Sequence, residues 1–309
     1  MINQLSSHAL ILKPMHKDRT FFLIVLAFLA IYFIWGSTYL FNRIVVREIP
    51  PFQLSGYRFI FASAIIFCMV FLSKRKKPIT RIQIRNAGIA GILFLTLGNG
   101  GVVWALQYVD SGMTALLVSA QPLVLILLLR IHEKKKISYQ SWIGVFLGIA
   151  GIYLLSNQNA LIETKMQVIG LFVIFLCLIA WGYGSMFVSK ADMPASSFEN
   201  SAYQMIIGGF SMILVSFLLG EPRTHWSTLS ELTIYSMIFL VLFGSILAFT
   251  SFNFLLRHVS PEKVSTNTYV NPIVALFLGW IVLSEIITLQ SIMATCILLT
   301  GVYFIHKGK

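Results

Sequence analysis

The stretch IWGSTY at residues 34–39 returns in altered form as AWGYGS at residues 180–185. The same shift of 146 positions aligns further identical residues: Ser55 with Ser201, Tyr57 with Tyr203, and Phe71-Leu72 with Phe217-Leu218. A shift of 150 positions aligns another set: Leu106 with Leu256, Pro122 with Pro272, Gly151 with Gly301, and Tyr153 with Tyr303. The chain therefore reads as an N-terminal tail, residues 1–20, followed by two copies of one design at residues 21–156 and 168–306.

Composition places both copies in a membrane. The chain of 309 residues is 57% hydrophobic and 11% charged, whereas about a quarter of a soluble domain is charged. A helix that crosses a bilayer needs about 20 mostly apolar residues. Ten ranges meet this description: 21–42, 53–73, 86–108, 112–130, 139–156, 168–189, 200–219, 232–257, 264–284 and 290–306. Five spans per copy is an odd number, so the second copy is inverted relative to the first. We expect an all-α membrane protein of ten transmembrane helices in two inverted five-helix repeats, an arrangement typical of alternating-access transporters.

The net charge of +12 is distributed unevenly. The side that holds both termini carries eighteen of the loop and tail lysines and arginines, and the other side carries four. Cytoplasmic loops are enriched in these residues, so both termini are predicted to be cytoplasmic. The cationic runs at 74–77 and 134–136 also suit anionic lipid headgroups. This pattern argues against a nucleic-acid partner.

Residues that carry catalysis are absent from the predicted spans. Cys68, Cys177 and Cys296 each lie alone in a span, without the spacing of a disulfide or zinc pair. No Asp or Glu lies at mid-span, the histidines lie in loops or at span ends, and there is no Walker A pattern. We therefore expect no catalytic site, no metal and no cofactor, and an intramembrane enzyme is the least favoured alternative.

Two spans carry polar residues at a depth where they should avoid lipid. In the third span, Asn99 lies between Gly98 and Gly100, and Trp104 follows one turn later. The glycines suit either close packing or a hinge. In the ninth span Asn267 and Asn271 are four residues apart on one helical face, with Tyr269 between them. Asn99, Trp104 and this face are candidate linings of a substrate path.

Pro122 and Pro272 occupy equivalent positions in the fourth and ninth spans. Proline removes one backbone hydrogen bond and clashes with the carbonyl four residues earlier. An amide precedes each proline, Gln121 in one case and Asn271 in the other. The two amides either satisfy freed carbonyls or meet substrate, and the kinks either shape the bundle or act as hinges.

Two further features bear on the site. Trp35 with Tyr39, and Trp181 with Tyr183, lie well inside their spans and could form aromatic walls. Arg58 is the charge that falls clearly within a span. It could extend to the outer interface or face an anion as a gate residue. The pattern Gly144-x-x-x-Gly148 suits packing within one chain or between two, so monomer and homodimer both stay open.

At these motifs the chain resembles the EamA family of the drug/metabolite transporter superfamily, and within it the YedA-type permeases of bacterial inner membranes. The strings that carry the resemblance are IWGSTY (34–39), GYRF (56–59), LGNG (97–100), DSGMTALLVSAQP (110–122), AWGYGS (180–185), LFGSI (242–246) and TYVNPIVALFLG (268–279). The resemblance implies ten helices, a bacterial inner-membrane location and a central cavity. Gln121 departs from it, because a smaller or apolar residue is expected before Pro122.

The expected function is that of a secondary transporter, an exporter or exchanger, working by alternating access. Its substrates would be small organic metabolites such as amino acids or related amphipathic compounds, as the resemblance implies. A flippase for a lipid-linked intermediate is the alternative, because some members of the superfamily move such carriers.

Overall fold

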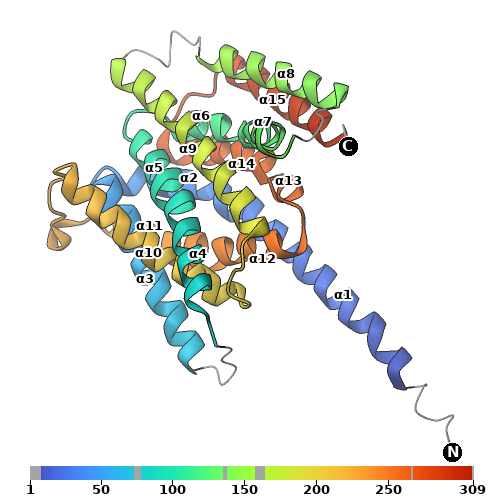
Figure 1. Ribbon diagram of the computed structural model, residues 1–309. Helices are drawn as coiled ribbons and strands as arrows, with labels where there is room; N and C mark the ends of the chain where they lie inside the picture. The colour runs from blue at the N-terminus through green and yellow to red at the C-terminus, as the bar shows by residue number, and fades with distance from the viewer. Residues whose placement is uncertain (1–7, 73–77, 135–137, 157–163, 266, 308–309) are drawn as a thin grey trace, which may run out of the picture.

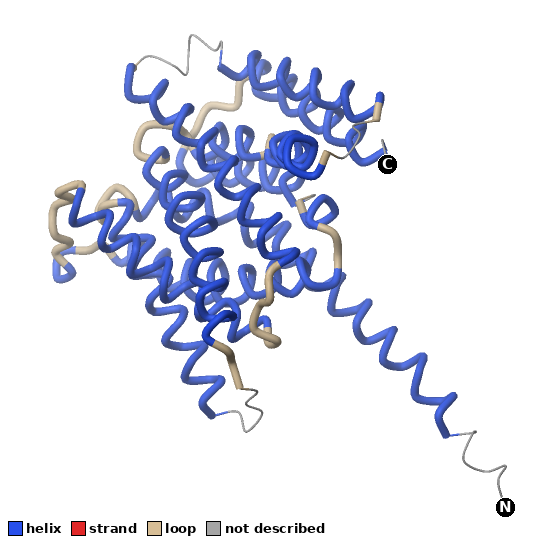
Figure 2. The backbone as a smooth tube through the Cα atoms, in the orientation of Figure 1, coloured by secondary structure: helices blue, strands red, loops and turns tan. Residues whose placement is uncertain are grey.

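A computed structural model describes residues 8–72, 78–134, 138–156, 164–265 and 267–307 as a helical bundle, with no strand among them (Figures 1 and 2). The α-helices are α1 (His8–Leu29), α2 (Trp35–Val45), α3 (Pro51–Leu72), α4 (Arg81–Gly91), α5 (Gly101–Ala105), α6 (Ser111–Val118), α7 (Gln121–Glu133), α8 (Tyr139–Ser156), α9 (Lys165–Lys190), α10 (Ser197–Leu218), α11 (Glu231–Phe239), α12 (Thr250–His258), α13 (Pro261–Val264), α14 (Asn267–Leu283) and α15 (Leu289–Lys307). Three π-helical stretches, η1 (Ala30–Ile34), η2 (Ile92–Gly100) and η4 (Leu240–Phe249), and one 3₁₀ turn, η3 (Trp226–Thr228), complete the described chain.

Helix occupies each of the ten predicted spans, which confirms the all-α fold. Seven helices or runs of consecutive helices are long and apolar enough to cross a bilayer: Arg19–Val45, Pro51–Leu72, Arg81–Ala105, Ser111–His132, Lys165–Lys190, Ser197–Leu218 and Glu231–His258. α8 has 18 residues, and the apolar stretches of α14 and α15 are shorter still. The number of helices that cross the membrane therefore stays a prediction. Large apolar side chains such as Phe71, Phe146 and Phe217 lie exposed on the outside of the bundle, as a lipid-facing surface requires.

The described part of the N-terminal tail is helical, and the apolar span that follows it begins at Arg19. α1 begins at His8, so the described part of the 1–20 segment is helical and continuous with the span. Figure 1 shows α1 projecting from the bundle toward the N-terminus.

Helices at equivalent positions in the two copies pack against each other. α3 packs on α10, α8 on α15, and α6 on α14, which are the second, fifth and fourth spans against the seventh, tenth and ninth. The first span also contacts the ninth, through α2 and α14, while the sixth contacts the fourth, through α9 and α7. A two-fold axis that relates two inverted repeats produces this exchange of partners.

Three spans change from α- to π-helical winding near their middle. The long stretches η2 and η4 lie in the third and eighth spans, which are equivalent in the two repeats. η1 lies in the first span, whereas its counterpart, α9, is α-helical throughout. π-Helical winding leaves backbone carbonyls in altered positions and is frequent at functional sites. The three stretches all pack at the centre of the bundle, where η1 contacts both η4 and α14.

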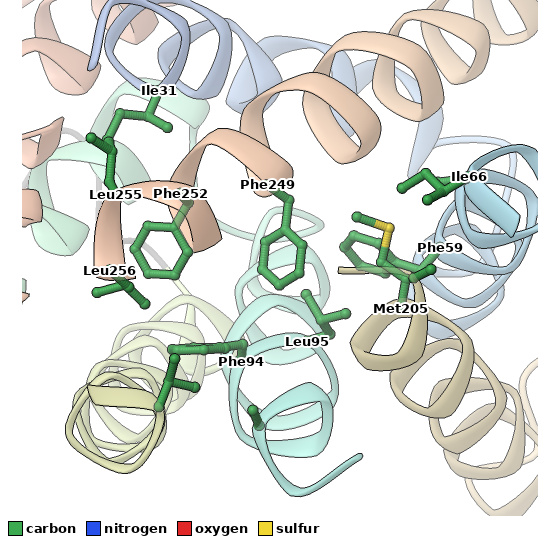
Figure 3. Packing of buried hydrophobic residues seen from close by; sticks show 14 of the residues in the cluster. Ile31, Phe59, Ile66, Phe94, Leu95, Met205, Phe249, Phe252, Leu255 and Leu256 are labelled. Atoms are coloured by element: carbon green, nitrogen blue, oxygen red, sulfur yellow. The ribbon is translucent and has the colours of Figure 1, made fainter. Parts of the chain in front are cut away.

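The central core joins the two repeats. Phe94 from η2 lies against Phe252 from α12, with ring centroids 5.4 Å apart, and Phe249 lies beside them (Figure 3). Phe59 and Met205, from the paired helices α3 and α10, extend this core on the other side. This apolar layer supports the site described next.

The two prolines are not structurally equivalent. Around Pro122 the fourth span is broken: α6 ends at Val118, a turn follows, and Pro122 occupies the first turn of α7, where no N–H is needed. Pro272 lies inside α14, which continues unbroken past it. The equivalent positions of the two prolines in the sequence therefore correspond to a broken fourth span and an unbroken ninth span.

Candidate functional site

A cavity of about 100 Å³ lies between the helices of the bundle. Its wall is shared by the first, second, third, fourth, sixth, eighth and ninth spans. Of the residues singled out from the sequence, the cavity is lined by Trp35, Tyr39, Arg58, Gly98, Asn99, Gln121, Trp181, Asn267 and Asn271.

Two tryptophans from equivalent spans form one wall. The Trp35 and Trp181 rings meet edge to face with centroids 5.8 Å apart. The Trp35 indole Nε1 donates to the Gly244 carbonyl in η4 at 3.2 Å, which fixes the ring across the repeat boundary. A Cβ at Gly98 would lie only 2.9 Å from the Trp181 ring, so glycine at this position lets η2 approach the ring. The aromatic wall is suited to an apolar group of a ligand.

Asn271 connects the ninth span to the π-helical stretch of the first. In the orientation that satisfies its neighbours, its amide nitrogen lies 3.2 Å from the Ile31 carbonyl and 2.7 Å from the Tyr32 carbonyl. Its amide oxygen then accepts from the Asn267 side chain at 3.2 Å. Both carbonyls belong to η1, where the change of winding alters the usual backbone partners. Asn271 therefore has a structural task as well as a place on the cavity wall.

The other amides on the wall differ in how fully they are bonded. Gln121 is buried, and its Nε2 donates to the Leu178 carbonyl of α9 at 3.2 Å, so it joins the two repeats. The Asn99 Oδ1 atom is buried and accepts no hydrogen bond within the described chain. A buried acceptor without a donor is unfavourable. A ligand that donates a hydrogen bond to Asn99 Oδ1 would satisfy this acceptor.

Several residues singled out from the sequence lie elsewhere. Trp104 lies outside the cavity, in a hollow between the outer loops. Tyr183 is 37% exposed and its hydroxyl lies 2.6 Å from His132 Nε2, outside the cavity. Gly100 faces Phe52, and neither Pro122 nor Pro272 lines the cavity. Tyr269 belongs to α14, but its side chain lies outside the described residues.

Sequence reasoning did not single out three polar residues of the wall. Thr38 and Asn42 follow Trp35 on one face of α2, and Asn42 accepts a hydrogen bond from Arg58. Ser185 lies on α9, one turn after Trp181. The spacing from each tryptophan was the available signal: residues three, four or seven positions later share its helical face.

Carboxylates in the loops after the first, seventh and ninth spans tie the two repeats together. Glu221 accepts from the backbone N–H groups of Phe52 and Gln53 at the start of α3. Glu48 accepts from the backbone and hydroxyl of Ser230, the residue that caps α11. Each tie runs from one repeat to the N-terminus of a helix in the other, where negative charge is favoured.

A third tie comes from Glu285, which accepts from Ser111 N at 3.1 Å and Ser111 Oγ at 2.7 Å at the start of α6. Asp110 beside it pairs with Arg43 at 3.4 Å. Burial, followed by the nearby Glu285 charge, raises the pKa of Asp110. Both carboxylates are thus bonded rather than freely solvated.

The Glu48 tie depends on pH in a defined direction. Hydrogen bonds from Ser230 lower the pKa of Glu48 below its usual value. Because the pKa of Glu48 is lower in the folded protein than in the unfolded chain, the bonds to Ser230 stabilise the fold at pH values above the pKa of the unfolded chain. This contribution is lost as the pH falls through the folded-state pKa.

Replacing Glu285 with glutamine is expected to open the outer side of the cavity more often. Charge at a helix N-terminus contributes about 0.3–1 kcal/mol, which corresponds to a change of up to about fivefold in the population of the open state. Cys177 lies in the cavity wall and is a native reporter. In a Cys68→Ser, Cys296→Ser background, its labelling by an impermeant thiol reagent from outside should rise. Glu231→Gln, in the first turn of α11, is the control. Equal labelling in the two variants would contradict a closing role for the Glu285 tie.

The fold is that of a multi-pass membrane protein built from two repeats. The profile of the EamA-like transporter family matches residues 22–157 and 168–306, so the chain belongs to this family. It is 32% identical over 284 residues to the uncharacterized inner membrane transporter YedA of Escherichia coli strain K12, covering 92% of this chain and 90% of that protein. It is 23% identical to the uncharacterized transporter YoaV of Bacillus subtilis strain 168, covering 91% of this chain and 95% of that one. A crystal structure of a protein 15% identical in sequence superposes with a TM-score of 0.67, covering 91% of this chain and 95% of that one, which supports the shared fold.

Proposed function

We propose that the protein is a secondary transporter of small organic metabolites, such as amino acids or related amphipathic compounds, in a bacterial inner membrane. The observation that carries the proposal is the cavity lined by residues of both repeats, whose wall holds two tryptophans and several amides. Such a surface suits a ligand with an apolar part and a polar part. The inner-membrane location rests on the name of the relative YedA.

Alternating access is the proposed mechanism. The two repeats meet at the cavity, so rocking one against the other would expose the same site to each side in turn. The structure has its outer ends tied by Glu48, Glu221 and Glu285, which lie on the outer side in the proposed topology. Opening outward requires these ties to break while the cytoplasmic ends close.

The direct test is transport by the purified protein in proteoliposomes. Vesicles loaded with a mixture of amino acids and small organic acids would be separated from the medium, and both fractions measured by mass spectrometry. Protein-dependent release or exchange of one class supports the proposal. A Gly98→Ala variant, whose added Cβ would lie 2.9 Å from the Trp181 ring and displace this part of the cavity wall, should reduce that transport. Undiminished release in this variant would show that the compounds do not pass through the cavity.

The proposed topology places both termini in the cytoplasm. The expected reporter pattern is outside for a fusion at residue 160 and inside for one at residue 307, because most loop cations lie on the side of the termini. Paired alkaline phosphatase and green fluorescent protein fusions at both positions measure this. The same side for both positions would overturn the ten-span topology.

Transport is expected to be insensitive to a pH gradient alone. No Asp or Glu lies at mid-span in the sequence, so the usual proton-relay carboxylate is missing. Facilitated diffusion or exchange then remains the simplest mechanism. Proteoliposomes with and without an imposed pH gradient, and with internal substrate present or absent, would measure this. Accumulation driven by the gradient alone would show that another group couples protons.

A further inference from the structure

Arg58 is a buried cation on the cavity wall. Its side chain extends from α3, and the residue is 2% exposed, so it does not reach the outer interface. Nε donates to Ser245 Oγ at 2.7 Å and Nη1 donates to Asn42 Oδ1 at 3.4 Å. Both acceptors are neutral. Within the described ranges, Arg58 forms no salt bridge with a carboxylate.

A charge in this position is unfavourable without an anion. Arginine stays protonated in proteins, and burying a charged group costs several kcal/mol unless it is paired. Two bonds to neutral oxygens satisfy part of the guanidinium. Nη2 makes no hydrogen bond within the described chain, and it belongs to a residue that lines the cavity. Arg58 Cζ lies 4.9 Å from the centroid of the Phe59 ring, which compensates another part of the charge, and an anion in the cavity would complete the compensation.

The second repeat shows that packing at this position does not need a charge. The shift of 146 that aligns the repeats places Arg58 on Gln204. Gln204 is also fully buried, and it bonds only to neutral groups: its Nε2 donates to Asn200 and Asn253. A neutral amide thus suffices in the copy where the residue does not line the cavity. The cation appears in the copy where the residue does line it.

We propose that Arg58 binds a carboxylate of the transported substrate, so that the protein carries small organic acids; this rests on the proposed function. A monocarboxylate carries one negative charge and balances the single guanidinium, and its two oxygens match the planar donor pair. A phosphate monoester carries nearly two negative charges and would leave one unbalanced in an otherwise neutral wall. The aromatic wall of Trp35 and Trp181 receives the apolar remainder of the acid.

Four compounds with one carbon skeleton test the charge requirement in the unmodified protein. The probes are 3-methylbutanoate, 3-methylbutan-1-ol, 3-methylbutylamine and 3-methylbutyl phosphate. None absorbs near 280 nm, so binding is followed by the change in tryptophan fluorescence of detergent-purified protein, in which Trp35 and Trp181 are the two tryptophans that line the cavity. The acid is expected to bind roughly 10- to 100-fold more tightly than the alcohol, the range for a hydrogen bond to a charged group. Equal affinity for acid and alcohol, or tighter binding of the amine or the phosphate, would overturn the proposal.

Substitutions then assign the preference to Arg58. Arg58→Gln introduces the residue of the second repeat, keeps hydrogen-bonding capacity, and should reduce the acid-over-alcohol ratio to about one. Arg58→Lys should retain part of the preference because the charge remains. Arg47→Gln removes an exposed arginine of the outer loop and should leave the ratio unchanged. A ratio that persists in folded Arg58→Gln protein would place the anion site elsewhere. Size-exclusion chromatography and thermal unfolding identify folded material, and if Arg58→Gln does not fold, the four-compound series and Arg58→Lys still decide.

The inference and the proposed function fail in different ways. Selective, Arg58-dependent binding of the acid without flux in proteoliposomes would support the carboxylate site and contradict transport of this compound. Flux of alcohol, amine and acid alike, unchanged in Arg58→Gln, would support transport and overturn the carboxylate site.

Discussion

An Asn253→Leu variant is expected to lose most of its folded yield and to unfold at a markedly lower temperature. Asn253 lies at the centre of a fully buried group of polar side chains between α12 and α10. Its Oδ1 accepts from Asn200 and Gln204, and its Nδ2 donates to Ser201 Oγ at 3.0 Å. Leucine would leave these partners unsatisfied in an apolar core, each at a cost of about 1–3 kcal/mol.

The expected total of at least about 3 kcal/mol is a large part of the 5–15 kcal/mol that stabilises a typical protein. Thermal unfolding followed by size-exclusion chromatography measures the loss. Thr250→Val is the matched control, because Thr250 lies one turn earlier on α12 and its buried Oγ1 makes no hydrogen bond within the described chain. The control should match or exceed the stability of the unmodified protein. An Asn253→Leu protein as stable as the control would show that the polar group is dispensable.

The fold was predictable because its signals are repeated and local. Long apolar ranges separated by cationic loops mark the helices, and the recurrence of Trp35-Gly36 as Trp181-Gly182 marks the two repeats. Each signal depends on a few neighbouring residues. The π-helical stretches η1, η2 and η4 were not predicted, because a change of winding depends on packing partners far away in the chain.

The site was predictable where helical spacing and depth agree. Asn267 and Asn271 are four residues apart and both line the cavity, as do Trp35 and Tyr39 at the same spacing. Tyr183 does not have this spacing from Trp181. It follows Trp181 by two residues, about 200° around an α-helix, and so faces away from the cavity. Depth in the membrane alone did not identify the inward face.

Partners across the repeat boundary could not be read from the sequence. Asn271 was expected to satisfy a proline-freed carbonyl or to meet substrate, whereas it lies against the carbonyls of Ile31 and Tyr32. Arg58 was expected either to extend to the outer interface or to act as an anion-facing gate, and it lies buried against Ser245 from the other repeat. In both cases the partner is more than 180 residues away in the chain. One sequence without structure carries no record of such contacts.

Replacing Pro122 with alanine is expected to change the balance between inward-open and outward-open states, whereas Pro272→Ala should change it little. At Ser119 and Ala120 the chain makes a turn whose N–H groups bond to Leu116 and Leu117, three residues earlier, and Pro122 starts α7 just after it. An alanine N–H at position 122 could bond to the Val118 carbonyl and make the fourth span one continuous helix. In such a continuous helix a proline at position 122 would be interior and would cost about 3 kcal/mol, so the substitution stabilises the continuous helix relative to the broken one by about this amount.

This free energy bears on a conformational balance because the broken span lines the cavity through Val118 and Gln121. If one state needs the break and the other does not, a gain of about 3 kcal/mol for the continuous form shifts their ratio by up to about a hundredfold. Pro272 lies in an unbroken helix, so its replacement adds a backbone hydrogen bond without changing the course of α14. Its main expected effect is a higher unfolding temperature.

Cys177 measures both variants in the Cys68→Ser, Cys296→Ser background, because it lies on the cavity wall between the two repeats. Impermeant thiol reagents added from the outer or the cytoplasmic side give a ratio of labelling rates for each protein. Pro122→Ala should change this ratio at least roughly tenfold, because it removes the break in the fourth span. Pro272→Ala should change it less than about threefold, because it only adds a hydrogen bond to a helix that is already continuous. Equal and opposite shifts would instead indicate that both prolines act as paired hinges, because equivalent elements of inverted repeats face opposite sides of the membrane. An unchanged ratio in both variants, with normal transport, would show that the break at Ser119–Ala120 shapes the bundle but has no part in the conformational change.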